Sequence, residues 1–333
     1  MPSIRSVLLP WRLGATPPSL EGSVTWVVGG VGVVGSGICR GLLRAGATVI
    51  VNSRSIDRLE GLRNSLGNPE RLVTINGSML AEGAATTVQT AMQRCGKLDH
   101  VVAHSSVRWW ALDSGDDGAM EGELPDPSQK LLAVEPSKFE AAAYKSASLH
   151  YGAAFHLLPR MTGGSYTFVT GGSRSLAWGP RGALGQLNTH AVRGLAAALR
   201  HDQESRWEAG QSHVDVQELR VGLAFEGQKA ALQQVDDASR GLSGFKLDPR
   251  REEPLSQGVG TLCAGILANT AVQPGAPAEA PRPPFDAATD ALPQNLRPRP
   301  NLLVVSSQDD LASLRQAFPA KDEDFGRFFA PEL

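Results

Sequence analysis

Short apolar runs alternate with stretches of helical periodicity along the first hundred residues. Val24–Val28 is a valine-rich run of strand length, and residues 38–45 then show the spacing of one helix face before Gly46 ends it. The same change of period repeats as far as Val101 and Val102. The pattern predicts strands at 24–28, 48–52, 72–75 and 101–102, separated by helices at 38–45, 56–66 and 81–94.

The alternation stops at residues 107–136, an acidic and turn-rich stretch that we interpret as an inserted surface loop. It then resumes, with helices predicted at 138–161 and 184–200 and strands at 166–170, 214–219 and in the "NLLVVSS" stretch. Strands and helices that alternate with short links form a parallel sheet covered on both faces, and right-handed crossovers make it doubly wound. We therefore predict an α/β fold, a single domain with inserted loops.

The predicted domain spans residues 21–306, between an N-terminal arm at 1–20 and a C-terminal tail at 307–333. Residues 272–300 are rich in proline and alanine and cannot form a core. Arg5 and Arg12, without an acidic residue in the arm, would also suit a transit peptide. Three prolines argue against the long amphipathic helix that such a peptide needs: Pro10, Pro17 and Pro18.

The composition excludes several classes of partner. With 32 basic and 34 acidic residues the formal charge is -2, which provides no general attraction for nucleic acid or an anionic membrane. The uncharged stretch at residues 22–39 contains six glycines, so we do not expect a membrane span there. The cysteines are odd in number and far apart, which favours a reducing, cytoplasmic compartment over a disulfide framework or a zinc site: Cys39, Cys95 and Cys263.

A glycine-rich loop joins the first predicted strand to the first predicted helix. Gly30, Gly32 and Gly35 fit the pattern G-x-G-x-x-G within a strand–helix–strand unit of about thirty residues. Glycines there let backbone amides approach a pyrophosphate at the helix N-terminus. The loop predicts a dinucleotide site on a Rossmann fold, with Gly29 and Val34 as further contacts.

The end of the second strand indicates which dinucleotide is bound. In an NAD site, an acidic residue at this point accepts hydrogen bonds from the ribose hydroxyls. Here the chain has Asn52, Ser53, Arg54 and Ser55, none of which is a carboxylate. Arg54 can instead pair with a 2′-phosphate, so we predict NADP(H), with Ser53 as a neighbouring contact; a solvated arginine at a helix start is the alternative. Other strand ends add the expected contacts Ser78, Met79 and Ala103.

Together these motifs resemble the short-chain dehydrogenase/reductase family over roughly residues 19–306. "SLEGSVTWVVGG" resembles the usual entry into the first strand, and "GGVGVVG" is more similar to the TGGxGxxG loop of the extended and atypical branches than to TGxxxGxG. "VNSRS" resembles an NADP(H)-type second strand, and "KLDHVV" resembles the lead into the fourth. The resemblance implies hydride transfer between a nicotinamide and a small substrate.

The family's catalytic residues are largely missing. The resemblance requires a serine, a YxxxK pair and a helix asparagine, and by register the serine falls on Ser173. The tyrosine position falls on Gly185, the lysine position on Thr189, which we keep as a cofactor contact, and the asparagine position on Ser146. Tyr144, Tyr151 and Tyr166 all lack a lysine four residues later, so no register shift restores the pair.

A different acid would have to supply the proton. His104 follows the fourth strand and is expected to titrate near neutrality, while His150 lies one turn beyond Ser146 on the same helix face. Ser173 is the preferred candidate, and structural roles remain open for all of them. Three tryptophans on the loops after the fourth and fifth strands suit either an aromatic substrate wall or ordinary packing: Trp109, Trp110 and Trp178. The acidic residues between 113 and 126 lack the spacing of a metal site.

Three functions remain open. The preferred one is a divergent NADP(H)-dependent oxidoreductase acting on a small carbonyl or imine, because loops rich in tryptophan suggest a substrate pocket. The second is a non-catalytic NADP(H)-binding sensor, and the third is a non-redox enzyme that reuses the pocket. The helices at 138–161 and 184–200 correspond to those through which the family dimerises, so we expect a homodimer or tetramer.

Overall fold

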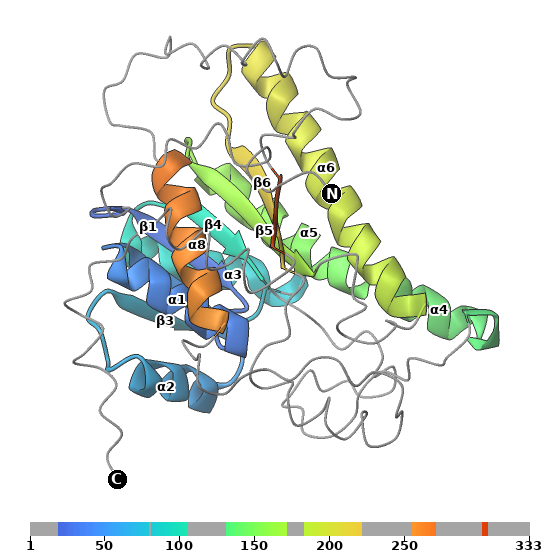
Figure 1. Ribbon diagram of the computed structural model, residues 1–333, viewed down its shortest axis with the longest axis horizontal. Helices are drawn as coiled ribbons and strands as arrows, with labels where there is room; N and C mark the ends of the chain where they lie inside the picture. The colour runs from blue at the N-terminus through green and yellow to red at the C-terminus, as the bar shows by residue number, and fades with distance from the viewer. Residues whose placement is uncertain are drawn as a thin grey trace.

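The core of the protein is one parallel β-sheet. The computed structural model describes residues 19–79, 81–104, 131–171, 183–221, 255–270 and 302–305. Its seven strands lie in the order β3-β2-β1-β4-β5-β6-β7, and every neighbouring pair is parallel (Figure 1). The predicted doubly wound α/β fold is confirmed. The strands are β1 Val24–Val28, β2 Thr48–Ser53, β3 Leu72–Asn76, β4 His100–Ala103, β5 Ser165–Gly171, β6 Asp215–Val221 and β7 Leu302–Val305.

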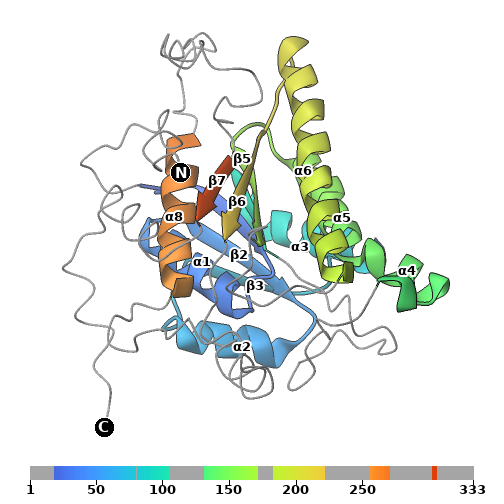
Figure 2. The ribbon, with the colours of Figure 1, turned by 45° about the vertical axis from the view of Figure 1, so that its right-hand side comes forward.

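Helices cover both faces of the sheet (Figure 2). Alternate strand residues point to opposite faces, so Val27 joins the core under one helix layer while Trp26 joins the core under the other. The first layer holds α1 (Val33–Arg44), α2 (Ile56–Ser65) and α8 (Leu255–Thr270). The second holds α3 (Ala81–Cys95), α5 (Lys145–Leu157) and α6 (Ala183–Glu208).

The structure corrects two of the predicted helices. The single helix expected at 138–161 consists of α4 (Pro136–Ala143), α5 and the 3-10 turn η3 (Leu158–Arg160), with a break at Tyr144. Tyr144 has φ -116° and ψ 5°, outside helical geometry, and Pro159 occupies the start of η3. The helix predicted at 184–200 continues to Glu208, because its polar last turns are exposed and therefore carry no apolar periodicity.

Helix α8 was missed by the sequence analysis, although it packs closely along α1. A Cβ on Gly41 would overlap the carbonyl of Gly260, and a Cβ on Gly260 would overlap the Gly37 carbonyl oxygen. Backbone contact at this distance is available only to glycine. Nearly all the described α8 side chains are buried between α1 and the sheet, so the helix shows no polar face from which its period could be recognised.

Several predicted segments lie wholly or mostly outside the described residues. They are the arm at 1–20, of which only Ser19 and Leu20 are described, most of the loop at 107–136, and the segments 272–300 and 307–333. Leu20 is buried and its amide donates to the Ala45 carbonyl at 2.7 Å, so this residue of the predicted arm belongs to the fold. Among the helices that the structure describes, none is long and apolar enough to cross a membrane.

Candidate functional site

The glycine loop carries the chain from the end of β1 into the start of α1. Gly29 has φ +86°, a left-handed conformation that favours glycine, and its carbonyl accepts from the Gly32 amide at 3.2 Å. Gly32 is the N-cap of α1 and provides no side-chain cap. The first amides of a helix lack intrahelical partners, so this uncapped end offers N–H donors to an anion.

The glycines of the loop are required for different reasons. A Cβ on Gly30 would lie 2.7 Å from a Val51 methyl group, and a Cβ on Gly35 would collide with the Gly29 carbonyl oxygen. Packing inside the protein therefore demands glycine at both positions. A Cβ on Gly32 would meet only the Gly29 carbonyl oxygen at 3.6 Å, an ordinary contact, and its φ of -81° is open to any residue. Within the described part of the chain, nothing accounts for a glycine at position 32, and the open space lies over the amides of the loop.

Val34 is buried in the core with 7% of its surface exposed. The Val34 side chain is therefore not available to a nucleotide, and this predicted contact can be made only by the Val34 backbone. The loop formed by Gly29, Gly30, Gly32 and Gly35 fits a pyrophosphate. Packing against Val51 and Gly29 excludes side chains at Gly30 and Gly35, and glycine at position 32 adds no side chain that would hold a pyrophosphate away from the amides.

The end of β2 holds its polar side chains in local hydrogen bonds. Asn52 accepts from the Trp26 indole at 3.0 Å and donates to the Gly77 carbonyl at 3.2 Å. The Ser53 hydroxyl accepts from the Ser55 amide, and the Ser55 hydroxyl caps α2. Arg54 is exposed beside this turn, where no carboxylate stands among residues 52–55. The geometry suits recognition of a phosphate by Arg54.

The other predicted cofactor contacts lie at the ends of β3 and β4. Met79 is buried in the core on the α5 side, and its carbonyl oxygen lies against Gly152, while Ser78 is partly exposed. Ala103 is fully buried in β4. The side chains of Met79 and Ala103 thus belong to the core and offer no polar groups.

His104, at the carboxyl end of β4, lies near a second histidine, His150 of α5. The amide of His104 donates to the Val28 carbonyl at 3.0 Å, which places this residue beside the start of the glycine loop. Burial, and secondarily the charge of nearby His150, lower the pKa of His104 to about 4. The expectation that His104 titrates near neutrality is therefore wrong: its imidazole is neutral at pH 7. His150 is itself buried and packs against the Phe168 ring, with centroids 5.6 Å apart.

Ser146 is bonded to Asn188, a residue that was not predicted from the sequence. The Asn188 side chain accepts from the Ser146 amide at 3.1 Å and donates to the Leu184 carbonyl at 3.0 Å. Asn188 therefore binds the first turn of α5 to the first turns of α6, with Thr189 next to it. Ser146 and His150 lie one turn apart on α5, as predicted. Ser173 and the tryptophans at 109, 110 and 178 lie outside the described residues.

The sequence analysis also missed a buried charged cluster. Glu218 of β6 contacts Arg220 of the same strand, Arg193 of α6 and Thr170 of β5. Glu218 and Arg193 are both at least nine-tenths buried. Two opposite charges two positions apart in a predicted strand, Glu218 and Arg220, were the available signal, because buried charges are rare unless they are paired.

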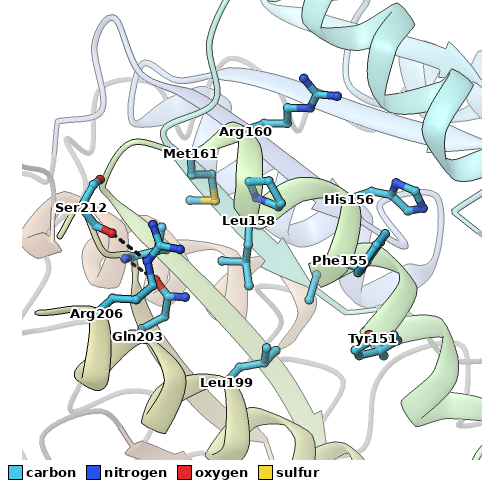
Figure 3. A pocket seen from close by; sticks show the side chains of 13 residues that line it. Tyr151, Phe155, His156, Leu158, Arg160, Met161, Leu199, Gln203, Arg206 and Ser212 are labelled. Atoms are coloured by element: carbon cyan, nitrogen blue, oxygen red, sulfur yellow. Dashed lines mark hydrogen bonds between the residues drawn. The ribbon is translucent and has the colours of Figure 1, made fainter. Parts of the chain in front are cut away.

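An open groove of about 560 Å³ lies elsewhere, between α5 and α6 (Figure 3). Its lining includes Met161, four residues before β5, and Val214, which directly precedes β6. The groove is therefore at the amino ends of the strands. The glycine loop and His104 follow the carboxyl ends, where ligands bind in open α/β sheets, so the groove is separate from the candidate site.

Comparisons with known proteins agree with this fold. No family model matches the chain, and no curated protein matches its sequence. Solved structures of short-chain dehydrogenase/reductase proteins are similar to it at low sequence identity. At such identities the similarity establishes the Rossmann-like fold alone.

Three of these structures illustrate the similarity. The NADP active-site complex of RhlG from Pseudomonas aeruginosa has a TM-score of 0.55 at 16% identity, covering 78% of this chain and 95% of that one. A dehydrogenase/reductase from Sinorhizobium meliloti 1021 has a TM-score of 0.53 at 18% identity, covering 77% and 93%. A short-chain dehydrogenase/reductase from Serratia marcescens BCRC 10948 has a TM-score of 0.51 at 17% identity, covering 77% and 92%.

Proposed function

We propose that this protein is an NADP(H)-dependent oxidoreductase that reduces a small carbonyl or imine without a Tyr/Lys pair. The observation that carries the proposal is the glycine loop, where Gly32 leaves space at the uncapped N-terminus of α1 that no contact among the described residues requires. The NADP complex of RhlG, a protein of similar fold, supports the choice of nucleotide. Arg54 follows β2 in a stretch, residues 52–55, that holds no carboxylate, and this supports NADP(H) over NAD(H).

The residues of the chain bind and orient the reactants. Amides of the glycine loop would hold the pyrophosphate, and Arg54 with Ser53 would hold the 2′-phosphate. A bound nicotinamide supplies or accepts the hydride. Positioning the acceptor at the carboxyl ends of β4 and β5 is then the main task of the protein.

The proton has to come from a group other than a tyrosine. His104 is neutral at pH 7 because its pKa is about 4, so it serves as a hydrogen-bonding group rather than as a cationic acid. Ser173, Ser146 and water remain the proposed sources. An imine is protonated readily in water and needs the least help, which favours imines among the substrates.

A second candidate is a non-catalytic NADP(H)-binding sensor. One observation favours it: Gly185 and Thr189 replace the acid–base pair of the resembling family, and the nearby histidine is uncharged. The sensor would bind the nucleotide through the same loop and turn over no substrate.

We also propose a homodimer or tetramer assembled through α5 and α6. Tyr151 and Phe155 of α5 are exposed large side chains, and α6 presents the exposed small residues Gly194, Ala197 and Ala198. The three cysteines are free thiols, which supports a cytoplasmic location.

Cofactor absorbance tests the proposal directly. Purified protein is mixed with NADPH or NADH and a panel of carbonyls and imines, and binding of each nucleotide is measured by calorimetry. Substrate-dependent oxidation of NADPH supports the reductase. Tight NADPH binding without turnover supports the sensor, and absence of nucleotide binding supports the third function, a non-redox enzyme on this fold.

A further inference from the structure

The groove between α5 and α6 is not used by the proposed nucleotide site. Its walls come from α5, from the turn η3 that follows it, and from the second half of α6 with the link to β6 (Figure 3). Its volume of about 560 Å³ is in the range of pockets that hold small organic molecules. The groove therefore has room for a ligand of its own, at the end of the sheet opposite the glycine loop.

The floor of the groove is apolar. Met161 and Val214 are buried members of the core, and Leu158 and Leu199 are partly buried and pack against the same core. Water against an apolar surface of this kind is unfavourable, and hydrocarbon that covers it is favoured. The floor therefore suits the apolar part of a ligand.

Positive side chains stand at the rim of the groove. Arg160 of η3 and Arg206 of α6 are exposed and belong to its lining. The described residues that line the groove include no aspartate or glutamate. Guanidinium groups bind carboxylates through charge-assisted hydrogen bonds. Charge complementarity therefore favours an anionic head group on the ligand.

Arg206 is held in place by the link between α6 and β6. Its Nε donates to the Ser212 carbonyl at 3.0 Å, and the Ser212 hydroxyl donates to the Thr162 carbonyl at 2.6 Å. Gln203, nearly one turn earlier on α6, accepts from the Val214 amide at 2.9 Å. The bond to Ser212 uses one of the five N–H groups of the guanidinium, which leaves its Nη donors for a ligand. A side chain that is already held loses less entropy when it binds.

The polar and apolar parts of the groove lie apart. Figure 3 shows Arg206 and Ser212 on one side and Tyr151 and Phe155 on the other. Tyr151 and Phe155 are 55% and 60% exposed, and their ring centroids lie 6.1 Å apart. A ligand that spans the groove would meet a cation at one end and apolar side chains along the rest of its length.

We propose that the groove binds an aliphatic carboxylate, with the carboxylate on Arg206 and the hydrocarbon chain along the apolar floor. Arg160 adds a second positive charge to the rim. The inference does not depend on the proposed NADP(H) chemistry, because the groove and the glycine loop lie at opposite ends of the strands.

Octanoate, octan-1-ol and butanoate test the head group and the chain separately. Each probe is titrated into the full chain, with and without NADPH, and followed by ligand-observed NMR. We expect octanoate to bind at least roughly tenfold more tightly than octan-1-ol, the range of one hydrogen bond to a charged group. Each buried methylene adds about fourfold in affinity, so octanoate should also bind at least about tenfold more tightly than butanoate.

Three arginine variants locate the binding site. Arg206→Gln should abolish the preference for octanoate over octan-1-ol. Arg160→Gln should reduce it severalfold, and this variant decides the question if Arg206→Gln fails to fold. Arg58→Gln is the matched control: Arg58 is an exposed arginine of α2 in the other helix layer, so its loss should leave the preference unchanged. Thermal unfolding is measured for each variant.

Several outcomes would overturn the inference. Equal affinities of octanoate and octan-1-ol for the wild-type chain, or no binding of either, would do so. A preference that survives in both Arg206→Gln and Arg160→Gln would place the probe elsewhere on the protein. Octanoate binding that disappears when NADPH is added would place it in the nucleotide site.

A second copy of the chain is the competing occupant, because Tyr151 and Phe155 also belong to the proposed α5–α6 assembly. Sedimentation of the titrated samples detects it. Failure of octanoate to bind in samples that contain the dimer assigns the groove to the second copy and overturns the inference. Arginine-dependent octanoate binding without NADPH oxidation by any carbonyl supports the inference and overturns the reductase alone.

Discussion

Gly32 offers the sharpest test of the nucleotide site, because no contact within the described part of the chain requires its lack of a side chain. Of the described residues, the new methyl group in Gly32→Ala would touch only the Gly29 carbonyl oxygen, at 3.6 Å. Alanine is a poorer N-cap than glycine by roughly 0.5–1 kcal/mol. The lower entropy of its unfolded chain offsets about 0.4–1 kcal/mol of that loss. We therefore expect the free energy of unfolding to change by less than about 1 kcal/mol.

The effect on nucleotide binding should be much larger. The methyl group projects into the space over the N-terminus of α1, where it would hold a pyrophosphate away from the amides. Losing one hydrogen bond to a charged group costs about 1.5–3 kcal/mol, so the Kd for NADPH should rise by roughly 10- to 150-fold. Calorimetric titration of NADPH into both proteins, with urea unfolding of the same samples, measures the two effects separately.

Two matched glycine variants complete the experiment. Gly61→Ala lies in α2 with open space around its Cβ, so it should stabilise the fold by up to about 1 kcal/mol and leave NADPH binding unchanged. Gly35→Ala collides with the Gly29 carbonyl and should reduce stability first. If Gly32→Ala binds NADPH as tightly as the wild type, the pyrophosphate does not lie over α1, and the argument from Gly32 is refuted.

Four further predictions follow from the structure. Arg54→Ala should weaken NADPH binding about tenfold or more and leave NADH binding unchanged by calorimetry; equal losses for both nucleotides would contradict the assignment. Gly260→Ala, whose Cβ overlaps the Gly37 carbonyl oxygen, should lower the free energy of urea unfolding by at least about 1–3 kcal/mol, and an unchanged value would refute the close contact of α1 and α8. Burial lowers the pKa of His100 from 6.5 to about 4. As the pH falls, the unfolded chain therefore binds the proton before the folded chain does, and stability that is present above pH 6.5 is lost toward pH 4, by up to about 3 kcal/mol. His100→Gln should remove this share of the pH dependence of unfolding. Phe155→Glu should shift the protein to monomers in sedimentation, and a wild-type protein that is already monomeric would remove the proposed interface.

The fold followed from local patterns in the chain. The period of apolar residues in a short segment depends on whether it is a strand or a helix, so β1 to β4 and their connecting helices could be recognised one at a time. The glycine loop and the polar end of β2 are also contiguous in the sequence, and the structure places both at the carboxyl end of the sheet. Helix α8 escaped this reasoning because it is buried on nearly all sides and has no polar face.

The chemistry of the candidate site was decided by contacts between distant segments. His104 has an ordinary pKa in an unfolded chain, and in the folded chain burial, with the charge of His150 nearby, lowers that pKa to about 4. The bond from Ser146 to Asn188 joins residues 42 positions apart, and Glu218 gathers partners from β5, β6 and α6. Sequence alone determined the doubly wound sheet and its glycine loop, because backbone period and glycine spacing are local properties. Desolvation and charge pairing depend on neighbours brought together by folding, so only the tertiary structure decided the lowered pKa of His104 and the contacts of Glu218 with its arginines.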